Sequence, residues 1–294
     1  MSVPVGIEEA LVGRSDLVAA GVGLDLLPAV VSARRRTNGG QWRIACPPGV
    51  VDELGRSFAL GTAVAEARAR DEFEVRTASG SRPDRTVFAS PGYVDAVAGP
   101  SDHRTLVTER EPSRTTAVHE TIVERFTGAE PVSIRMPGRT ELLAAARDWL
   151  DNRFADDLAV VLDSIDLDPA GLDRSAVIDD RTLFVALAAR HDLLFTDVRK
   201  WAHDVGIVEK QRFSEARKAL ESRGLIESVR VPMDRGRPNN RLRAVDKTLI
   251  RVDPEDFLAA LRERVRAGDM PDGPDVDEAN SGDADRPVWD RRGR

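Results

Sequence analysis

Cysteine, aromatic residues and histidine are all scarce in this sequence of 294 residues. Cys46 is the only cysteine, which excludes an intrachain disulfide and a cysteine-based zinc cluster. We expect it to be a small core residue at the end of a strand. The four histidines share no metal-ligand spacing, and none begins an H-x-E or H-E-x-x-H pattern. We therefore predict neither a metal nor any other cofactor.

Long apolar runs and catalytic motifs are missing as well. No run approaches the length of a membrane span, and no basic patch precedes an apolar run near the N-terminus, so we expect a cytoplasmic protein without a membrane partner. The sequence contains no G-x-S-x-G, Walker loop or G-x-G-x-x-G, and Gly21-Val22-Gly23 stands within a run that reads as helix. We assign no catalytic residue and predict that the protein is not an enzyme.

What is present is the element order of a winged helix-turn-helix over residues 180–246. Two apolar-patterned helices are followed by Gly206, which suits the sharp turn before a third helix at about residues 209–222. Gly224 suits the left-handed cap that ends this helix. A strand over residues 225–231, a basic turn and a return strand follow. The order predicts a DNA-binding domain.

The charge of this segment supports the same partner. Residues 180–246 hold 14 Lys and Arg against 10 Asp and Glu, a net +4, whereas the whole chain holds 43 against 50, a net −7. A cationic segment in an acidic protein can neutralise phosphates and release counterions, while the acidic remainder limits indiscriminate adhesion. The alternative is a solvated surface whose excess of four charges is accidental. We favour double-stranded DNA as the partner, because charge and element order agree.

The third helix and the hairpin supply the candidate DNA contacts. Periodicity predicts that one face of this helix packs in the core through Phe213, Ala216, Ala219 and Leu220, which leaves its basic residues free to meet a groove. The same spacing argument places Trp201, Trp149 and Phe154 in the core rather than against bases. The candidate contacts from the helix are Lys210, Gln211, Arg212, Ser214, Arg217 and Lys218. Those from the wing are Arg235, Gly236, Arg237, Pro238, Asn239 and Arg241.

The wing tip carries the most specific short motif. In Arg-Gly-Arg-Pro at 235–238, glycine lets the backbone approach closely, the guanidinium groups suit an electronegative minor groove, and proline keeps the tip extended. The run is similar to the core of an AT-hook. An ordinary hairpin turn with solvated arginines is the alternative, and the position at a predicted wing favours DNA contact.

The fold class expected for the whole chain is mixed α+β. An N-terminal α/β domain with one mixed sheet precedes the winged helix, and turn-rich residues mark the boundary. The expected parts are a domain for effector binding or assembly at 1–165, a linker at 166–179, the winged helix at 180–246, a C-terminal helix at 247–267 and a disordered acidic tail at 268–294. Within the first domain we expect helices at 1–40, 51–69, 115–126 and 140–165, and strands at 42–46, 73–77, 86–89, 93–97, 105–107 and 132–135.

A family resemblance rests on the winged-helix residues. The run from Leu194 to Ile207, followed by Lys210, Phe213-Ser214, Leu220-Glu221, Gly224-Leu225-Ile226, Val231-Pro232 and Gly236-Arg237-Pro238, resembles the C-terminal winged helix of the haloarchaeal TbsP transcription regulators. The N-terminal half is similar in element order to that family's upstream domain and to the phospholipase-D-like effector domains of TrmB-type regulators. The abundance of Arg and Asp and the rarity of Lys suit a halophilic archaeal origin, although GC-rich coding bias would also favour Arg.

Two departures qualify the resemblance. Phospholipase D enzymes need an H-x-K-x₄-D motif, and no histidine here is followed two residues later by lysine. Glu209 stands where the resemblance implies a serine before the recognition helix, and glutamate is a poorer N-cap. An active phosphodiesterase is therefore excluded, and the start of the recognition helix is left open.

The resulting hypothesis is a sequence-specific transcription regulator. The resemblance implies control of sugar or central-carbon genes, with a sugar or sugar phosphate as effector. We expect a homodimer, because one recognition helix covers few base pairs and a two-fold protein doubles the site. The stripe Phe257, Leu258, Leu261 and Val265 can form the dimer surface or pack on its own winged helix. The competing hypotheses are a non-catalytic adaptor that binds protein through its winged helix, and an enzyme with an unrecognised N-terminal site.

Overall fold

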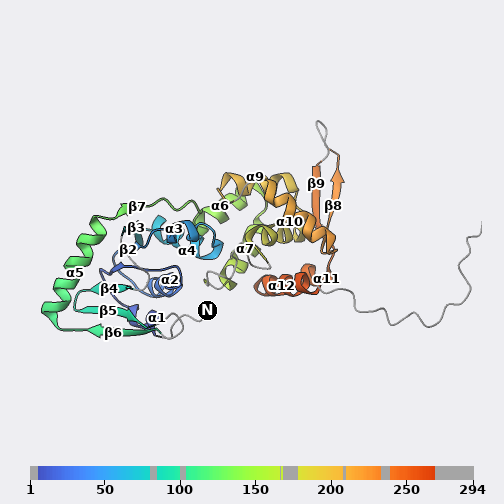
Figure 1. The fold of residues 1–294 in the computed structure, drawn as a ribbon. Coiled ribbons are helices and arrows are strands. Elements are labelled where there is room, and N and C mark those ends of the chain that lie inside the picture. The colour runs from blue at the N-terminus through green and yellow to red at the C-terminus, as the bar shows by residue number, and fades with distance from the viewer. Residues whose placement is uncertain are drawn as a thin grey trace, which may run out of the picture.

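The chain folds into a sheet-based N-terminal half and a helical C-terminal half (Figure 1). The computed structural model describes residues 6–79, 85–99, 104–165, 167, 178–207, 210–232 and 239–268. The predicted mixed α+β class is confirmed, with a seven-stranded mixed sheet followed by a helix-turn-helix and a small hairpin. No helix in these ranges is long and apolar enough to cross a membrane.

The N-terminal sheet has the strand order β6-β5-β4-β1-β2-β3-β7. Three central strands run parallel, because α-helical crossovers connect them, and the flanking strands are antiparallel. The strands are β1 (Val18–Ala20), β2 (Trp42–Cys46), β3 (Phe73–Thr77), β4 (Val87–Ser90), β5 (Tyr93–Ala98), β6 (Thr105–Glu109) and β7 (Glu130–Pro131).

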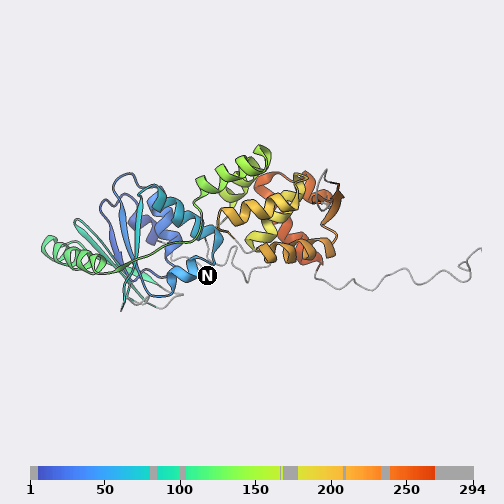
Figure 2. The same cartoon turned by 90° about the horizontal axis from the view of Figure 1, so that it is seen from above.

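Helices cover both faces of this sheet (Figure 2). Strand β2 shows why: Trp42, Ile44 and Cys46 pack in one apolar cluster, whereas the alternate residue Ala45 packs in the cluster beneath α5. Cys46 is buried as predicted, and burial raises the pKa of its thiol to about 12. The helices on the first face are α1 (Ile7–Leu11), α2 (Leu27–Arg35), α3 (Val50–Leu54) and α4 (Phe58–Ala69), and α5 (Pro112–Thr127) lies on the second.

The prediction of helices throughout residues 1–40 was wrong for residues 18–20, which form a central strand of the sheet. Residues 18–20 form β1, which pairs with β2 and β4. All three residues are buried, so the strand lacks the polar–apolar alternation that marks a half-exposed strand. Gly21 therefore follows a strand, with φ of +76°, rather than standing inside a helix.

Two other predicted elements in this half differ in extent. The helix expected at 51–69 is two helices, because the chain turns between Leu54 and Phe58. The strand expected at 132–135 is absent; the strand in this region is Glu130–Pro131, which pairs with the end of β3.

The C-terminal half is built from helices around a two-stranded hairpin. Helix α8 is buried along its whole length from Leu183 to Ala189, because neighbouring elements cover every side of it. The elements are α6 (Arg139–Trp149), α7 (Asn152–Ser164), α8 (Asp180–Arg190), α9 (Phe195–Asp204), α10 (Lys210–Ser222), β8 (Ile226–Val231), β9 (Asn239–Ala244), α11 (Lys247–Arg251), the 3₁₀ turn η1 (Pro254–Asp256) and α12 (Phe257–Gly268).

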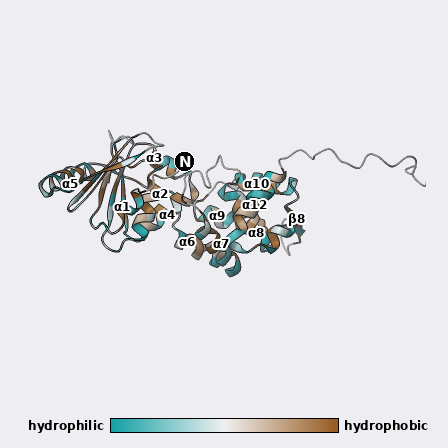
Figure 3. Ribbon diagram, turned by 90° about the horizontal axis from the view of Figure 1, so that it is seen from below, coloured by the Kyte–Doolittle hydropathy of each residue, from teal (hydrophilic) through white to brown (hydrophobic). Residues whose placement is uncertain are grey.

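Helices α6 and α7 pack in the C-terminal core rather than on the sheet (Figure 3). Leu142 and Ala146 of α6, and Phe154 and Leu158 of α7, belong to the same apolar cluster as the winged helix. This packing differs from the expected domain at 1–165, and we propose a boundary before α6 instead. The expected linker at 166–179 is described only at 167, 178 and 179, and the expected tail lies outside the described residues from 269 onward.

The C-terminal stripe is buried within its own chain. Phe257, Leu258, Leu261 and Val265 are all at most 5% exposed and pack in the winged-helix core. Of the two roles considered for this stripe, the structure shows intramolecular packing. It leaves no apolar face of α12 for a dimer contact through these residues.

The two halves are joined by close side-chain contacts. Phe58 of α4 packs edge-on against Phe184 of α8, with 5.2 Å between ring centroids. Glu66 of α4 accepts hydrogen bonds from the backbone N–H of Thr140 at 2.9 Å and from its hydroxyl at 2.6 Å. A Cβ at Gly138 would lie 2.8 Å from Glu66 Oε2 and 3.3 Å from its Cα, so a side chain there would crowd Glu66.

Candidate nucleic-acid interface

Helices α9 and α10 form the predicted helix-turn-helix. Gly206 adopts φ of +79°, and the N–H of Ile207 donates to the carbonyl of Ala202, which closes the turn. Gly224 adopts φ of +66° after α10, as expected for a left-handed cap. Trp201 is fully buried, which confirms its assignment to the core of α9.

An isolated β-bridge fixes the wing to the start of α9 and was not predicted from the sequence. Leu194 forms a bridge with Arg241, and the N–H of Leu242 donates to the carbonyl of Leu193 at 2.9 Å. This contact holds the hairpin against the start of α9. A single bridging residue leaves no alternating pattern, so periodicity could not reveal it.

The exposed side of α10 presents part of the predicted contact set. Arg212 and Ser214 are half-buried and Lys218 is exposed, and none of the three side chains has a hydrogen bond or ion pair with a described residue. Lys210 and Gln211 lie in the first turn of α10, but their side chains are outside the described part, as is Glu209. Ala219, expected in the core, is exposed.

Arg217 faces inward, contrary to its predicted role on DNA. Its guanidinium lies over the Phe195 ring at 4.9 Å and donates to the hydroxyl of Ser228 at 3.1 Å. Glu221 accepts a hydrogen bond from the same Ser228 hydroxyl and lies 3.7 Å from Arg217. These contacts tie α9, α10 and β8 together, so we assign Arg217 to positioning the recognition helix.

The hairpin divides its basic residues between two faces. Arg241 and Arg243 are exposed on the face opposite the buried Leu242, and Arg243 is paired with Asp192 at 3.1 Å. The wing residues Arg235, Gly236, Arg237 and Pro238 lie outside the described part, and Asn239 is the first residue of β9, where it pairs with Val231.

Arg230 is a hairpin cation that the sequence analysis did not single out. The register pairs Arg230 with Asn240 and Ser228 with Leu242, which places Arg230 on the face of the hairpin that packs against α10. Its side chain is exposed and has no ion pair with any described residue. Alternation along β8 was the signal that could have found it.

One predicted core aromatic is on the surface. Trp149 is 44% exposed at the end of α6, and the ammonium of Lys200 lies 4.3 Å from its ring centroid. The prediction of a core position was wrong, because the indole lies at the surface beside Lys200 while its neighbours Ala146 and Leu150 pack on the apolar cluster. Phe154, assigned by the same argument, is fully buried.

Asp246 fixes the end of the hairpin to the C-terminal helices. Its carboxylate accepts the backbone N–H groups of Thr248 and Leu249, and the Arg264 guanidinium donates to it at 2.7 Å. Burial works to raise the pKa of Asp246, but the hydrogen bonds from Arg264 and from the two N–H groups outweigh it and lower the pKa below its ordinary value. The carboxylate therefore stays charged at neutral pH and holds the hairpin base.

Comparison with known proteins accounts for nearly the whole described chain. The model described as "Transcriptional regulator TbsP-like, N-terminal" matches residues 3–137, and "Transcriptional regulator TbsP-like, C-terminal HTH domain" matches residues 138–262. The two matches meet just before α6. No curated protein sequence matches the chain.

Among solved structures, the chain is similar to the archaeal chromatin protein TrmBL2, whose structure "shows a novel mode of DNA binding". The similarity has 15% sequence identity and a TM-score of 0.33, and it covers 42% of this chain and 48% of that one. The chain thus spans about half the length of that protein. A likeness of this size carries no argument about the fold or function here.

Proposed function

Because the chain belongs to the TbsP-like transcriptional regulators and carries their helix-turn-helix DNA-binding domain, we propose that it is a sequence-specific regulator that reads a major groove with α10. Arg212 and Lys218 carry this proposal, since both are cations on the recognition helix without a partner among the described residues. Arginine can make bidentate contacts to guanine edges, whereas the exposed ammonium of Lys218 suits a phosphate.

The hairpin is proposed to contact the backbone beside α10. Arg230 lies on the helix-facing side of β8, so one duplex can meet both elements. Arg241 projects from the other face and is proposed to meet a flanking phosphate. In this division of labour the helix supplies discrimination between sequences and the hairpin supplies affinity.

Genome-wide mapping of bound DNA identifies the operator, and titration of operator and random duplexes at several salt concentrations then tests the proposal. Specific binding predicts a steep fall of affinity with salt and a clear preference for the operator. An adaptor that uses this domain to bind protein would show neither.

The N-terminal half is proposed to be catalytically silent and to respond to a metabolite of sugar or central-carbon metabolism. The support is family membership together with the missing phosphodiesterase motif. A metabolite that changes operator affinity at fixed salt would support a sensor role. If none does and the protein is dimeric, assembly is the remaining role of this half.

A homodimer is also proposed, because two recognition helices on two half-sites double the length of sequence read. The C-terminal stripe is buried within the chain, so the dimer contact must use other residues. Light scattering of the free protein and of its operator complex gives the stoichiometry. Two chains on an operator with two-fold symmetric half-sites would support the dimer.

A further inference from the structure

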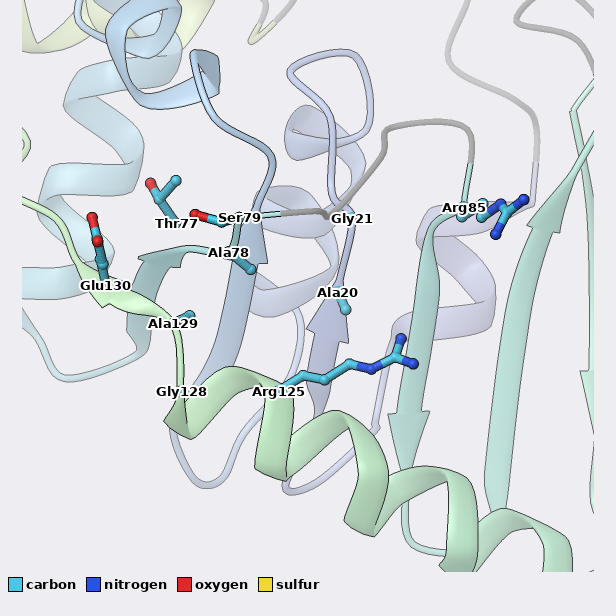
Figure 4. A pocket seen from close by; sticks show the side chains of 10 residues that line it. All are labelled: Ala20, Gly21, Thr77, Ala78, Ser79, Arg85, Arg125, Gly128, Ala129 and Glu130. Atoms are coloured by element: carbon cyan, nitrogen blue, oxygen red, sulfur yellow. The ribbon is translucent and has the colours of Figure 1, made fainter.

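A cavity of about 620 Å³ opens where the parallel strands β1 and β3 end, beside the C-terminal end of α5 (Figure 4). In open α/β sheets, ligands bind at the carboxyl ends of the parallel strands, and this volume is in the range of small-molecule sites. The lining residues are Ala20, Gly21, Thr77, Ala78, Ser79, Arg85, Arg125, Gly128, Ala129 and Glu130.

Small residues create the space. Half of the lining residues are glycine or alanine, and they come from three separate segments of the chain. Gly21 ends β1 with φ of +76°, and its carbonyl accepts a hydrogen bond from the hydroxyl of Thr86 at 2.6 Å, which fixes the turn. The floor of the cavity is therefore held in place by backbone rather than filled by side chains.

Two arginines give the cavity its chemistry. Neither the Arg85 nor the Arg125 side chain has an ion pair or hydrogen bond with any residue that the structure describes. Figure 4 shows the Arg125 side chain reaching from α5 toward the strands, with Arg85 at the rim beyond Ala20. Among the lining residues that the structure describes, Glu130 is the only acidic one, so these residues carry a net charge of +1 (two Arg against one Glu).

The end of α5 does not cancel this charge. A helix C-terminus carries partial negative charge, which would repel an anion. The Arg76 guanidinium donates to the carbonyls of Thr127 at 3.0 Å and of Ala129 at 3.5 Å and also pairs with Glu74 at 2.7 Å, so these carbonyls already have a hydrogen-bond partner. The guanidinium of Arg125 is left for a ligand.

We infer that this cavity binds a small organic anion, with its phosphate or carboxylate paired to Arg125 and Arg85 and its hydroxyl groups contacting Thr77 and Ser79. Guanidinium groups match the geometry of both kinds of anion. Ala129 and Glu130 also belong to the segment that leads through β7 to α6, so an occupant touches the connection to the DNA-binding half. The inference rests on the proposed function only for the ligand's role as an effector.

Calorimetric titration of the full chain at fixed salt tests the site, with glucose 6-phosphate, glucuronate and neutral glucose as probes. We expect saturable binding of at least one of the two anions and none of glucose. Binding of glucose 6-phosphate alone assigns the site to phosphates, and binding of glucuronate alone assigns it to carboxylates. The variants are Arg125→Gln and Arg85→Gln, and the matched control is Arg56→Gln, an exposed N-terminal arginine outside the cavity.

Each cavity variant should weaken anion binding at least tenfold, whereas the control should bind like the wild type. Anion binding that survives both cavity substitutions, equal binding of glucose, or no binding of either anion would overturn the inference. Affinity for the operator without ligand is measured on the same preparations. If the wild type binds the operator but neither anion, only this inference is wrong. If the wild type does not bind the operator, the proposed function is wrong.

Discussion

Glu66 is a single residue that caps a helix in the other half of the molecule. The N-cap of α6 is Gly138, which has no side chain to offer, and Glu66 accepts the hydrogen bonds of Thr140 in its place. Burial works to raise the pKa of Glu66, but the bonds from Thr140 and the charges of Arg70 and Arg139 outweigh it and lower the pKa.

The lowered pKa fixes the sign of a pH effect. The folded state favours the charged form of Glu66. Its contribution to the unfolding free energy is therefore fully present above the unfolded-state pKa of about 4.3, and it is lost as pH falls through the lower pKa of the folded state. Glu66→Gln should therefore cost about 1–3 kcal/mol of unfolding free energy at pH 7 and much less at acidic pH. Urea unfolding at both pH values measures the difference, with the exposed Glu120→Gln as control. Equal losses at both pH values would contradict the role of the charge.

Gly138 offers a steric test of the same junction. Its φ of −66° is ordinary for any residue, so only the close approach of Glu66 opposes a side chain there. Gly138→Ala should lower the unfolding free energy by about 1–3 kcal/mol, because the added methyl group overpacks the contact. Gly40→Ala, where a Cβ would meet open space, is the matched control and should be neutral or nearly so. An unchanged unfolding free energy in Gly138→Ala would show that Glu66 can shift to make room for the methyl group.

At the scale of elements, we predict different roles for two arginines of the hairpin, because their surroundings differ. Arg230 is exposed without an ion pair to a described residue, whereas Arg243 is paired with Asp192 and lies 3.7 Å from Glu227. Arg230→Gln should weaken binding to every duplex and reduce the salt slope by roughly one unit. Arg243→Gln should leave the slope nearly unchanged, since its charge is already compensated. The opposite ranking would place the DNA on the other face of the hairpin.

The elements that the sequence predicted well are those with a strong local pattern. Helices α9 and α10 carry apolar stripes and are bounded by Gly206 and Gly224, so their type and order followed from the residues. Strand β1 is buried on all sides and has no polar face, so periodicity could not distinguish it from a buried helix, whereas helix α8, although buried in the same way, was predicted from its apolar pattern. The inward turn of Arg217 depends on Phe195 and Ser228, which only tertiary structure brings together.

At the scale of the molecule, aromatic rings connect the sheet domain to the DNA-binding core. Phe58 packs on Phe184, which packs on Trp201, which packs on Phe154, with 5.2 to 5.5 Å between successive centroids. Of these four rings, only Phe58 comes from the N-terminal half. Its burial is the aromatic part of the docking of the two halves, beside the hydrogen bonds between Glu66 and Thr140.

Phe58→Ala should cost about 3–5 kcal/mol and separate the unfolding of the two halves, because it removes the buried contact between them. Calorimetry of the variant should show two transitions where the wild type shows one. Trp149→Ala, which removes a half-exposed ring away from the junction, should keep the single transition. Two transitions already in the wild type would show that the halves unfold independently.

The central claim is that α10 reads DNA sequence while the rest of the domain holds it in place. The most direct measurement titrates the wild type and Arg212→Ala against the mapped operator and a random duplex at several salt concentrations. The wild type should bind both with steep salt dependence and prefer the operator. Arg212→Ala should lose about 1–3 kcal/mol of that preference, with binding to the random duplex much less affected. Undiminished preference in the variant, or binding by the wild type that does not respond to salt, would contradict the account.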